Sequence, residues 1–224
     1  MEVTDLIKDF KTLSNKRKSL VLIFSLLTIF ADIFVTFKIL NFNNAYSLEI
    51  KILIITYLLL VITSLGYLSI YDIYHYSIPD KFTLILPIVM TLISIALIFA
   101  IGTQGELIFW DGNTITPLYS LLGGLAGILV IGLIVLATKG NGMGDGDIRI
   151  MAIIGLLVGI NKLLIAFYIT IFTALILGLT YSLLIKKIKG VPIPFVPFIA
   201  LGGILTLILG LDNDVVLNLF RIVI

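Results

Sequence analysis

The chain has 224 residues, of which 60% are hydrophobic and only 12% are charged, and its mean hydropathy is +1.21. Soluble domains are about half apolar and a quarter charged, so this composition excludes an ordinary water-soluble fold and indicates a lipid bilayer as the solvent. The net charge of +2 is too small to indicate a nucleic-acid partner, and the absence of cysteine excludes disulfides and Cys-ligated zinc.

Long apolar segments predict an all-α, polytopic transmembrane bundle of about seven helices. The first 18 residues are basic and have the apolar spacing of a short amphipathic helix that lies on the membrane surface. A β-barrel would instead show alternating strands of ~10 residues. The expected helices cover approximately residues 19–40, 50–71, 82–102, 117–138, 147–160, 163–185 and 194–211, of which the one at 147–160 is short.

The distribution of lysine and arginine predicts the orientation of the chain. With a cytoplasmic N-terminus, the inner segments carry 11 of these residues and the outer segments carry 4. We therefore expect a multi-pass protein of the cytoplasmic membrane. In this orientation the loops around 72–81 and 139–149 both lie on the inner side, and the loop with Glu106 and Asp111 lies outside.

The first stretch that contains candidate catalytic residues runs from Asp72 to the element Ile78-Pro79-Asp80. Pro79 suits a helix start, and Asp80 can cap the first turn. Asp72 ends an apolar helix, where the helix dipole disfavours an acid. It is therefore a candidate functional residue, with a merely solvated acid at the membrane edge as the plainer interpretation.

The second stretch, Lys139–Arg149, alternates glycine with other residues and contains Asp145 and Asp147. Its glycines permit positive φ and close backbone approach, so this loop could hold a carboxylate against another element. A flexible loop with solvated charges is the alternative. A phosphate cradle is disfavoured, because no Gly-Lys-Ser/Thr sequence follows and the acids would repel phosphate.

The two acidic stretches acquire a common chemistry if they meet at the inner face. Two carboxylates in a partly dry site share one proton, which leaves one acid and one base to activate water against a peptide carbonyl. The single His75 and the scattered acidic residues supply too few clustered ligands for a metal ion, so we expect no metal site.

The third stretch, Pro192–Gly202, has three prolines that disrupt a helix start. The freed backbone groups need partners in the protein or in a water-filled cavity. Alone, the stretch predicts a kinked helix start. Beside two aspartates, we expect it to line a cleft in which an extended peptide pairs with the backbone.

Together the three stretches resemble, in order, the motifs of the type IV prepilin peptidase family, GxGD aspartic membrane peptidases that include the archaeal preflagellin and prepilin peptidases. The family has an aspartate followed by an Ile/Leu-Pro-Asp/Asn element, then Gly-Met-Gly-x-Gly-Asp-x-Lys, then Pro-Phe-Gly-Pro-Phe-x-Ala. This chain matches at Asp72 with Ile78–Asp80, at Gly142–Arg149 with arginine for lysine, and at Pro194–Ala200 with valine for glycine.

The resemblance implies that Asp72 and Asp147 are the catalytic pair of an aspartic endopeptidase. The short Gly-x-Gly-Asp pattern also fits Asp145; we select Asp147 because Arg149 and the small Ala152 then match the longer pattern. The residues expected to bind substrate or shape the site are Pro79, Gly144, Asp145, Gly146, Arg149, Pro194, Phe195 and Pro197.

The implied domains are a peptidase-like core at 50–211, an additional helix and loop at 19–49, the basic segment at 1–18 and a tail at 212–224. The implied partners are pilin-like or archaellin precursors and the bilayer, with the oligomeric state left open. No cofactor is expected, since the cysteines of the zinc element that bacterial members often carry and a nucleotide-binding fingerprint for methyl transfer are both missing. A presenilin-like intramembrane protease and a proton- or cation-coupled transporter remain alternatives.

Overall fold

The computed structural model describes residues 15–41, 47–103, 105–110, 113–140, 143–184 and 194–210. This part of the chain forms an all-α bundle with one small hairpin, which confirms the predicted fold class. The expected surface helix and the C-terminal tail lie outside the described residues, apart from the first turn of α2. The helices are α2 (Asn15–Asn41), α3 (Leu48–His75), α4 (Asp80–Ile101), α5 (Pro117–Thr138), α6 (Asp145–Val158), α7 (Ile160–Leu184) and α8 (Val196–Leu209).

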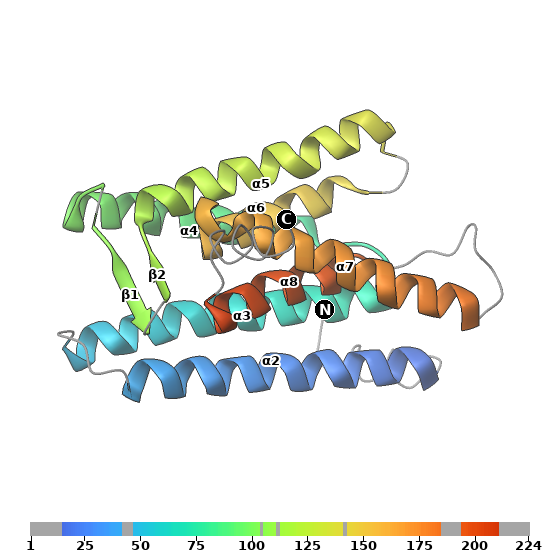
Figure 1. Ribbon diagram of the computed structural model, residues 1–224, viewed down its shortest axis with the longest axis horizontal. Coiled ribbons are helices and arrows are strands. Elements are labelled where there is room, and N and C mark those ends of the chain that lie inside the picture. The colour runs from blue at the N-terminus through green and yellow to red at the C-terminus, as the bar shows by residue number, and fades with distance from the viewer. Residues whose placement is uncertain are drawn as a thin grey trace, which may run out of the picture.

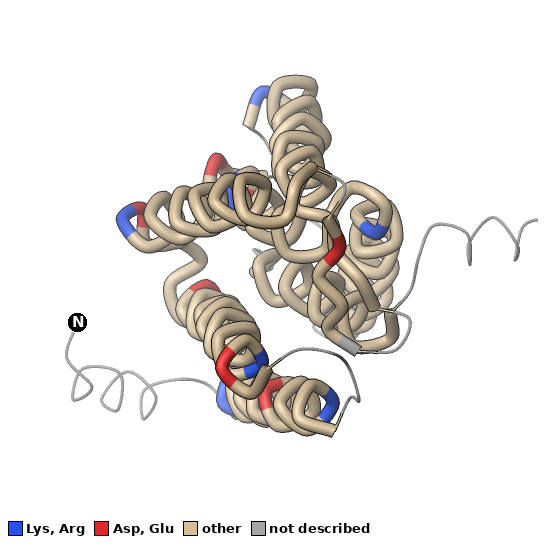
Figure 2. The backbone as a smooth tube through the Cα atoms, turned by 90° about the vertical axis from the view of Figure 1, so that its left-hand side faces the viewer, with Lys and Arg blue, Asp and Glu red and all other residues tan. Residues whose placement is uncertain are grey.

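Five of these helices (α2, α3, α4, α5 and α7) are long and apolar enough to cross a membrane. They run side by side along the long axis of the molecule (Figure 1). Their outer faces carry large exposed apolar side chains, such as Phe30, Phe99 and Leu136, and charged positions are few when the bundle is viewed end on (Figure 2). An apolar outer surface of this kind suits contact with lipid.

Helices α6 and α8 are shorter, with 14 residues each. At 1.5 Å per residue each measures about 21 Å, which is less than the ~30 Å hydrocarbon core. The helix expected at 194–211 is present and is two residues shorter at each end. Pro194 precedes the helix and Gly210 ends it in a left-handed conformation, with φ 61°.

Helix α6 lies at the centre of the bundle, and ten of its 14 residues are buried. It packs backbone to backbone against α5, because a Cβ atom added at Gly155 would lie 2.1 Å from the Gly123 carbonyl oxygen. Gly127 meets the Met151 backbone in the same way. Small residues at four-residue spacing allow this close approach of membrane helices.

A two-stranded antiparallel hairpin, β1 (Leu107–Trp110) and β2 (Asn113–Ile115), joins α4 to α5. The sequence predicts only a loop here, because the strands have four and three residues and lie next to charged residues. The hairpin lies at the left end of the bundle in Figure 1, whereas α3 ends and α6 begins at the right end. The two aspartates therefore belong to the end remote from the hairpin.

Candidate active site

Asp72 lies one turn before the end of α3, and its side chain is turned into the protein, with only 6% exposed. Its Oδ2 atom accepts a hydrogen bond from the Val196 backbone N–H at 3.1 Å. The Phe195 N–H adds a second backbone contact to the same carboxyl group. An acid at the C-terminal end of one helix is thus stabilised by the N-terminal end of another.

The start of α8 is suited to hold this carboxylate. The first N–H groups of a helix have no partner within the helix, and the dipole makes that end positive. Pro197, in the first turn, has no N–H to offer, so the amides of Phe195 and Val196 supply the contacts. The proline pattern of this stretch predicts the lining of a substrate cleft; it does not predict that the backbone here contacts Asp72.

Asp147 is the third residue of α6, and 8% of it is exposed. Its Oδ2 accepts the Gly144 N–H at 3.0 Å, while the Asp147 N–H donates to the Gly144 carbonyl at 3.1 Å. This reciprocal pair closes the first turn of α6. Burial raises the pKa of Asp147 above its ordinary value, and the hydrogen bond from Gly144 opposes the shift.

The two carboxyl groups come from helices far apart in the sequence, yet they interact electrostatically. Helix α8 contacts both α3 and α6 and completes the arrangement. Two buried acids under mutual repulsion favour a state with one proton between them. The chemistry available to such a pair is general acid–base catalysis.

Asp145 occupies a different environment, although it is only two residues from Asp147. It is the first residue of α6 and is exposed, whereas Asp147 is buried. Residues two positions apart on a helix point about 200° apart, so Asp145 and Asp147 lie on opposite faces of α6. The geometry therefore favours the longer motif register.

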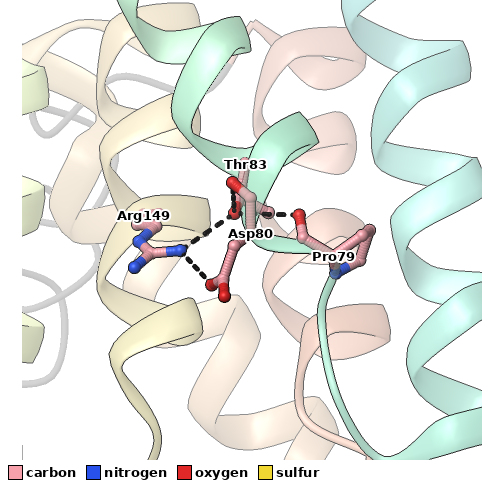
Figure 3. A network of polar contacts seen from close by, with 4 residues as sticks. All are labelled: Pro79, Asp80, Thr83 and Arg149. Atoms are coloured by element: carbon pink, nitrogen blue, oxygen red, sulfur yellow. Dashed lines mark hydrogen bonds and ion pairs between the residues drawn. The ribbon is translucent and has the colours of Figure 1, made fainter.

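An ion pair joins the second motif to the first (Figure 3). Arg149 Nη1 contacts Asp80 Oδ1 at 2.5 Å and Thr83 Oγ1 at 3.4 Å. Asp80 was expected to cap α4; the residue before it, Pro79, takes the N-cap position, and no side chain caps this end. The Asp80 side chain is 79% exposed, so the pair contributes at most ~1 kcal/mol.

Close packing against Ile78 explains why residue 146, between the two acids of the second motif, is a glycine. A Cβ atom there would lie 2.5 Å from Cδ1 of Ile78, the residue before Pro79. The start of α6 and the loop after α3 therefore approach closely. Hydrogen bonds, an ion pair and this contact link all three sequence motifs at one end of the bundle.

The described residues contain no group of three or more histidine, cysteine, aspartate or glutamate side chains that could hold a metal ion. His75 ends α3 and packs against the Tyr71 ring, with centroids 4.5 Å apart. It makes an aromatic contact at the edge of the site.

Comparison with known proteins gives one family match. A model of the type IV leader peptidase family matches residues 58–179, which is more than half of the chain. The matched segment contains Asp72 and Asp147 but ends before α8. No solved structure matches the chain significantly.

Two curated relatives are similar over part of their length. A Bacillus subtilis (strain 168) protein named prepilin leader peptidase/N-methyltransferase is 38% identical over 100 residues, covering 43% of this chain and 40% of the relative. A Dichelobacter nodosus protein of the same name is 38% identical over 95 residues, covering 41% and 32%. The similar segment thus spans less than half of each relative.

Proposed function

This chain belongs to the type IV leader peptidase family, and we propose that it is a membrane aspartic endopeptidase that removes the leader peptide of type IV pilin-like or archaellin precursors at the cytoplasmic membrane face. Relatives named prepilin leader peptidase support the substrate class. The excess of lysine and arginine in the segments that adjoin the site supports the cytoplasmic face.

The observation that carries the proposal is that Asp72 and Asp147 are both buried at the same end of the bundle, where α8 packs against the helices of both. In the proposed reaction the ionised acid takes a proton from water, and the water oxygen attacks the scissile carbonyl carbon. The protonated acid donates its proton to the carbonyl oxygen. The tetrahedral intermediate then breaks its C–N bond: the proton taken from water passes to the leaving amine, and one hydroxyl proton of the intermediate returns to the acid that protonated the carbonyl oxygen.

The position of the pair suits a substrate cut at the membrane boundary. Asp72 is three residues from the end of α3, and Asp147 is in the first turn of α6. A precursor with a basic leader outside the bilayer and an apolar helix within it would present its junction at this level. Pro79, Gly144, Asp145, Gly146, Arg149, Pro194, Phe195 and Pro197 shape the surroundings in this proposal.

The test is to incubate membranes containing the protein with candidate pilin and archaellin precursors and to sequence the N-termini of the products. We expect one new N-terminus at the junction of leader and apolar helix, and none with Asp72→Asn. Cleavage inside the apolar helix would replace the proposal with a presenilin-like activity. Proton-coupled uptake into vesicles, without any cleavage, would replace it with a transporter.

A further inference from the structure

At the end of α8 remote from the aspartates, buried hydrogen bonds connect the helix to the hairpin and to α7. Asn113, the first residue of β2, is 1% exposed, and its Nδ2 donates to the Leu207 carbonyl oxygen at 2.6 Å. Its Oδ1 accepts a hydrogen bond from Lys162 Nζ at 2.7 Å. Hairpin, α7 and α8 are thereby connected through one amide side chain.

Lys162 brings a buried positive charge to this network of hydrogen bonds. Lysine is almost never buried unless it is paired, and Lys162 is only 4% exposed. It lies in the first turn of α7, where the dipole of its own helix disfavours a cation. Its hydrogen bond polarises the Asn113 amide, which donates to the last turn of α8, and that end of a helix favours positive charge.

Between its two ends α8 is closely packed and has little room to bend. A Cβ atom at Gly202 would lie 2.5 Å from the Ala166 carbonyl oxygen of α7, and one at Gly203 would lie 2.4 Å from the Ile154 side chain of α6. A packed helix transmits a displacement along its axis as a rigid element. A shift at Leu207 therefore reaches Val196, whose N–H contacts Asp72.

We propose that Asn113 and Lys162 are positioning residues that act through α8 to hold its first N–H groups against Asp72. The inference rests on the proposed peptidase function and adds to it a contact network about one helix length from the reacting atoms. It assigns a role to the hairpin, which lies at the opposite end of the bundle from the site (Figure 1).

Loss of this anchor should affect the chemical step more than substrate binding. If α8 shifts, the ionised form of Asp72 loses hydrogen-bond donors that stabilise it. Misplacement of a catalytic group by about 1 Å costs on the order of 10²-fold in rate. The acid limb of the pH–rate profile should then move to higher pH, an effect that simple loss of folded protein would not produce.

The test compares Asn113→Asp and Lys162→Met with the wild type, using cleavage kinetics in vesicles at several pH values. Aspartate at 113 keeps an acceptor for Lys162 but cannot donate to Leu207, so it breaks only the contact with α8. We expect kcat to fall roughly 10-fold or more in both variants, with KM nearly unchanged and the acid limb shifted upward. Lys162→Arg should recover most of the rate.

The matched control is Lys38→Met, which removes a lysine that lies over the Phe34 ring of its own helix α2. It should behave as wild type. A wild-type rate and pH profile in Asn113→Asp would overturn the inference, as would a rise in KM at constant kcat. Asp72→Asn, run in parallel, separates the two proposals: cleavage by that variant refutes the catalytic pair, whatever the anchor variants do.

Discussion

Each buried aspartate accepts a hydrogen bond from the backbone at the beginning of a helix, Asp72 from Val196 of α8 and Asp147 from Gly144 before α6. These donors have no intrahelical partner and belong to the positive end of the dipole. The protein thus uses fixed backbone groups to stabilise two acids away from water. Arg149, the basic residue of the second motif, instead pairs with Asp80.

At the scale of the residue, motif and composition predicted which acids are candidates, and burial now distinguishes Asp147 from Asp145. The partners of Asp72 could not be predicted in the same way. Every residue except proline has a backbone N–H, so a sequence does not show which of these groups will contact Asp72. Val196 also stands where the family motif has glycine. The run of prolines was the available signal, since it marks a helix start with unsatisfied amides.

The raised pKa of Asp147 has a consequence for stability. A folded-state pKa above the unfolded value gives stabilisation that is fully present below the unfolded pKa and is lost as the pH rises through the folded pKa. Asparagine resembles the protonated acid at all pH values. We therefore expect Asp147→Asn to raise Tm by a few degrees at about pH 7, since 1 kcal/mol corresponds to roughly 2–4 °C in a chain of this size.

Thermal unfolding in detergent at several pH values checks this expectation, and the gain should vanish at about pH 3, where the wild-type acid is protonated. Exposed Asp145→Asn is the control and should show no such pH dependence. A lower Tm for Asp147→Asn at both ends of the pH range would show that the carboxylate is stabilising, contrary to the burial argument.

At the scale of the element, apolar length predicted the bounds of most helices to within a few residues. The hairpin was missed because strands of three and four residues leave too short a pattern. The expected span at 194–211 exceeds α8 by two residues at each end, because hydropathy does not mark the residue at which a helix begins or ends. The contact between α5 and α6 was also invisible, since glycine spacing indicates close packing without naming the partner.

The packing of α5 on α6 can be tested with two alanine substitutions. In Gly155→Ala the new methyl group meets Gly123 backbone atoms, which cannot rotate away. We expect a loss of roughly 1–3 kcal/mol, seen as a lower Tm, together with slower cleavage because α6 carries Asp147. Gly132→Ala, on α5 with open space around its Cβ position, should leave both quantities nearly unchanged. Equal effects of the two substitutions would contradict this packing argument.

At the scale of the whole molecule, the two aspartates lie at one end of the bundle and the hairpin at the other (Figure 1). The proposed cytoplasmic location of the aspartate end rests on the count of lysine and arginine. In the proposed function this orientation decides substrate access, because a precursor whose basic leader stays on one side of the membrane can reach the site only from that side.

The absence of cysteine makes the orientation directly measurable. Thr103→Cys and Thr138→Cys place exposed thiols at opposite ends of the bundle, after α4 and at the end of α5. In intact cells a membrane-impermeant maleimide should label Thr103→Cys alone, and in permeabilised cells both variants. Labelling of Thr138→Cys alone in intact cells would place the aspartates on the outer face and remove the proposed access for the leader.

The catalytic pair itself is tested most directly by the rate of precursor cleavage with equal amounts of wild type, Asp72→Asn, Asp147→Asn and Asp145→Asn in vesicles. Loss of an acid–base group costs roughly 10²–10⁴-fold. We predict a loss in this range for Asp72→Asn and for Asp147→Asn, and a rate within a few-fold of wild type for Asp145→Asn. Activity retained by either of the first two variants, or lost only in Asp145→Asn, would contradict the account.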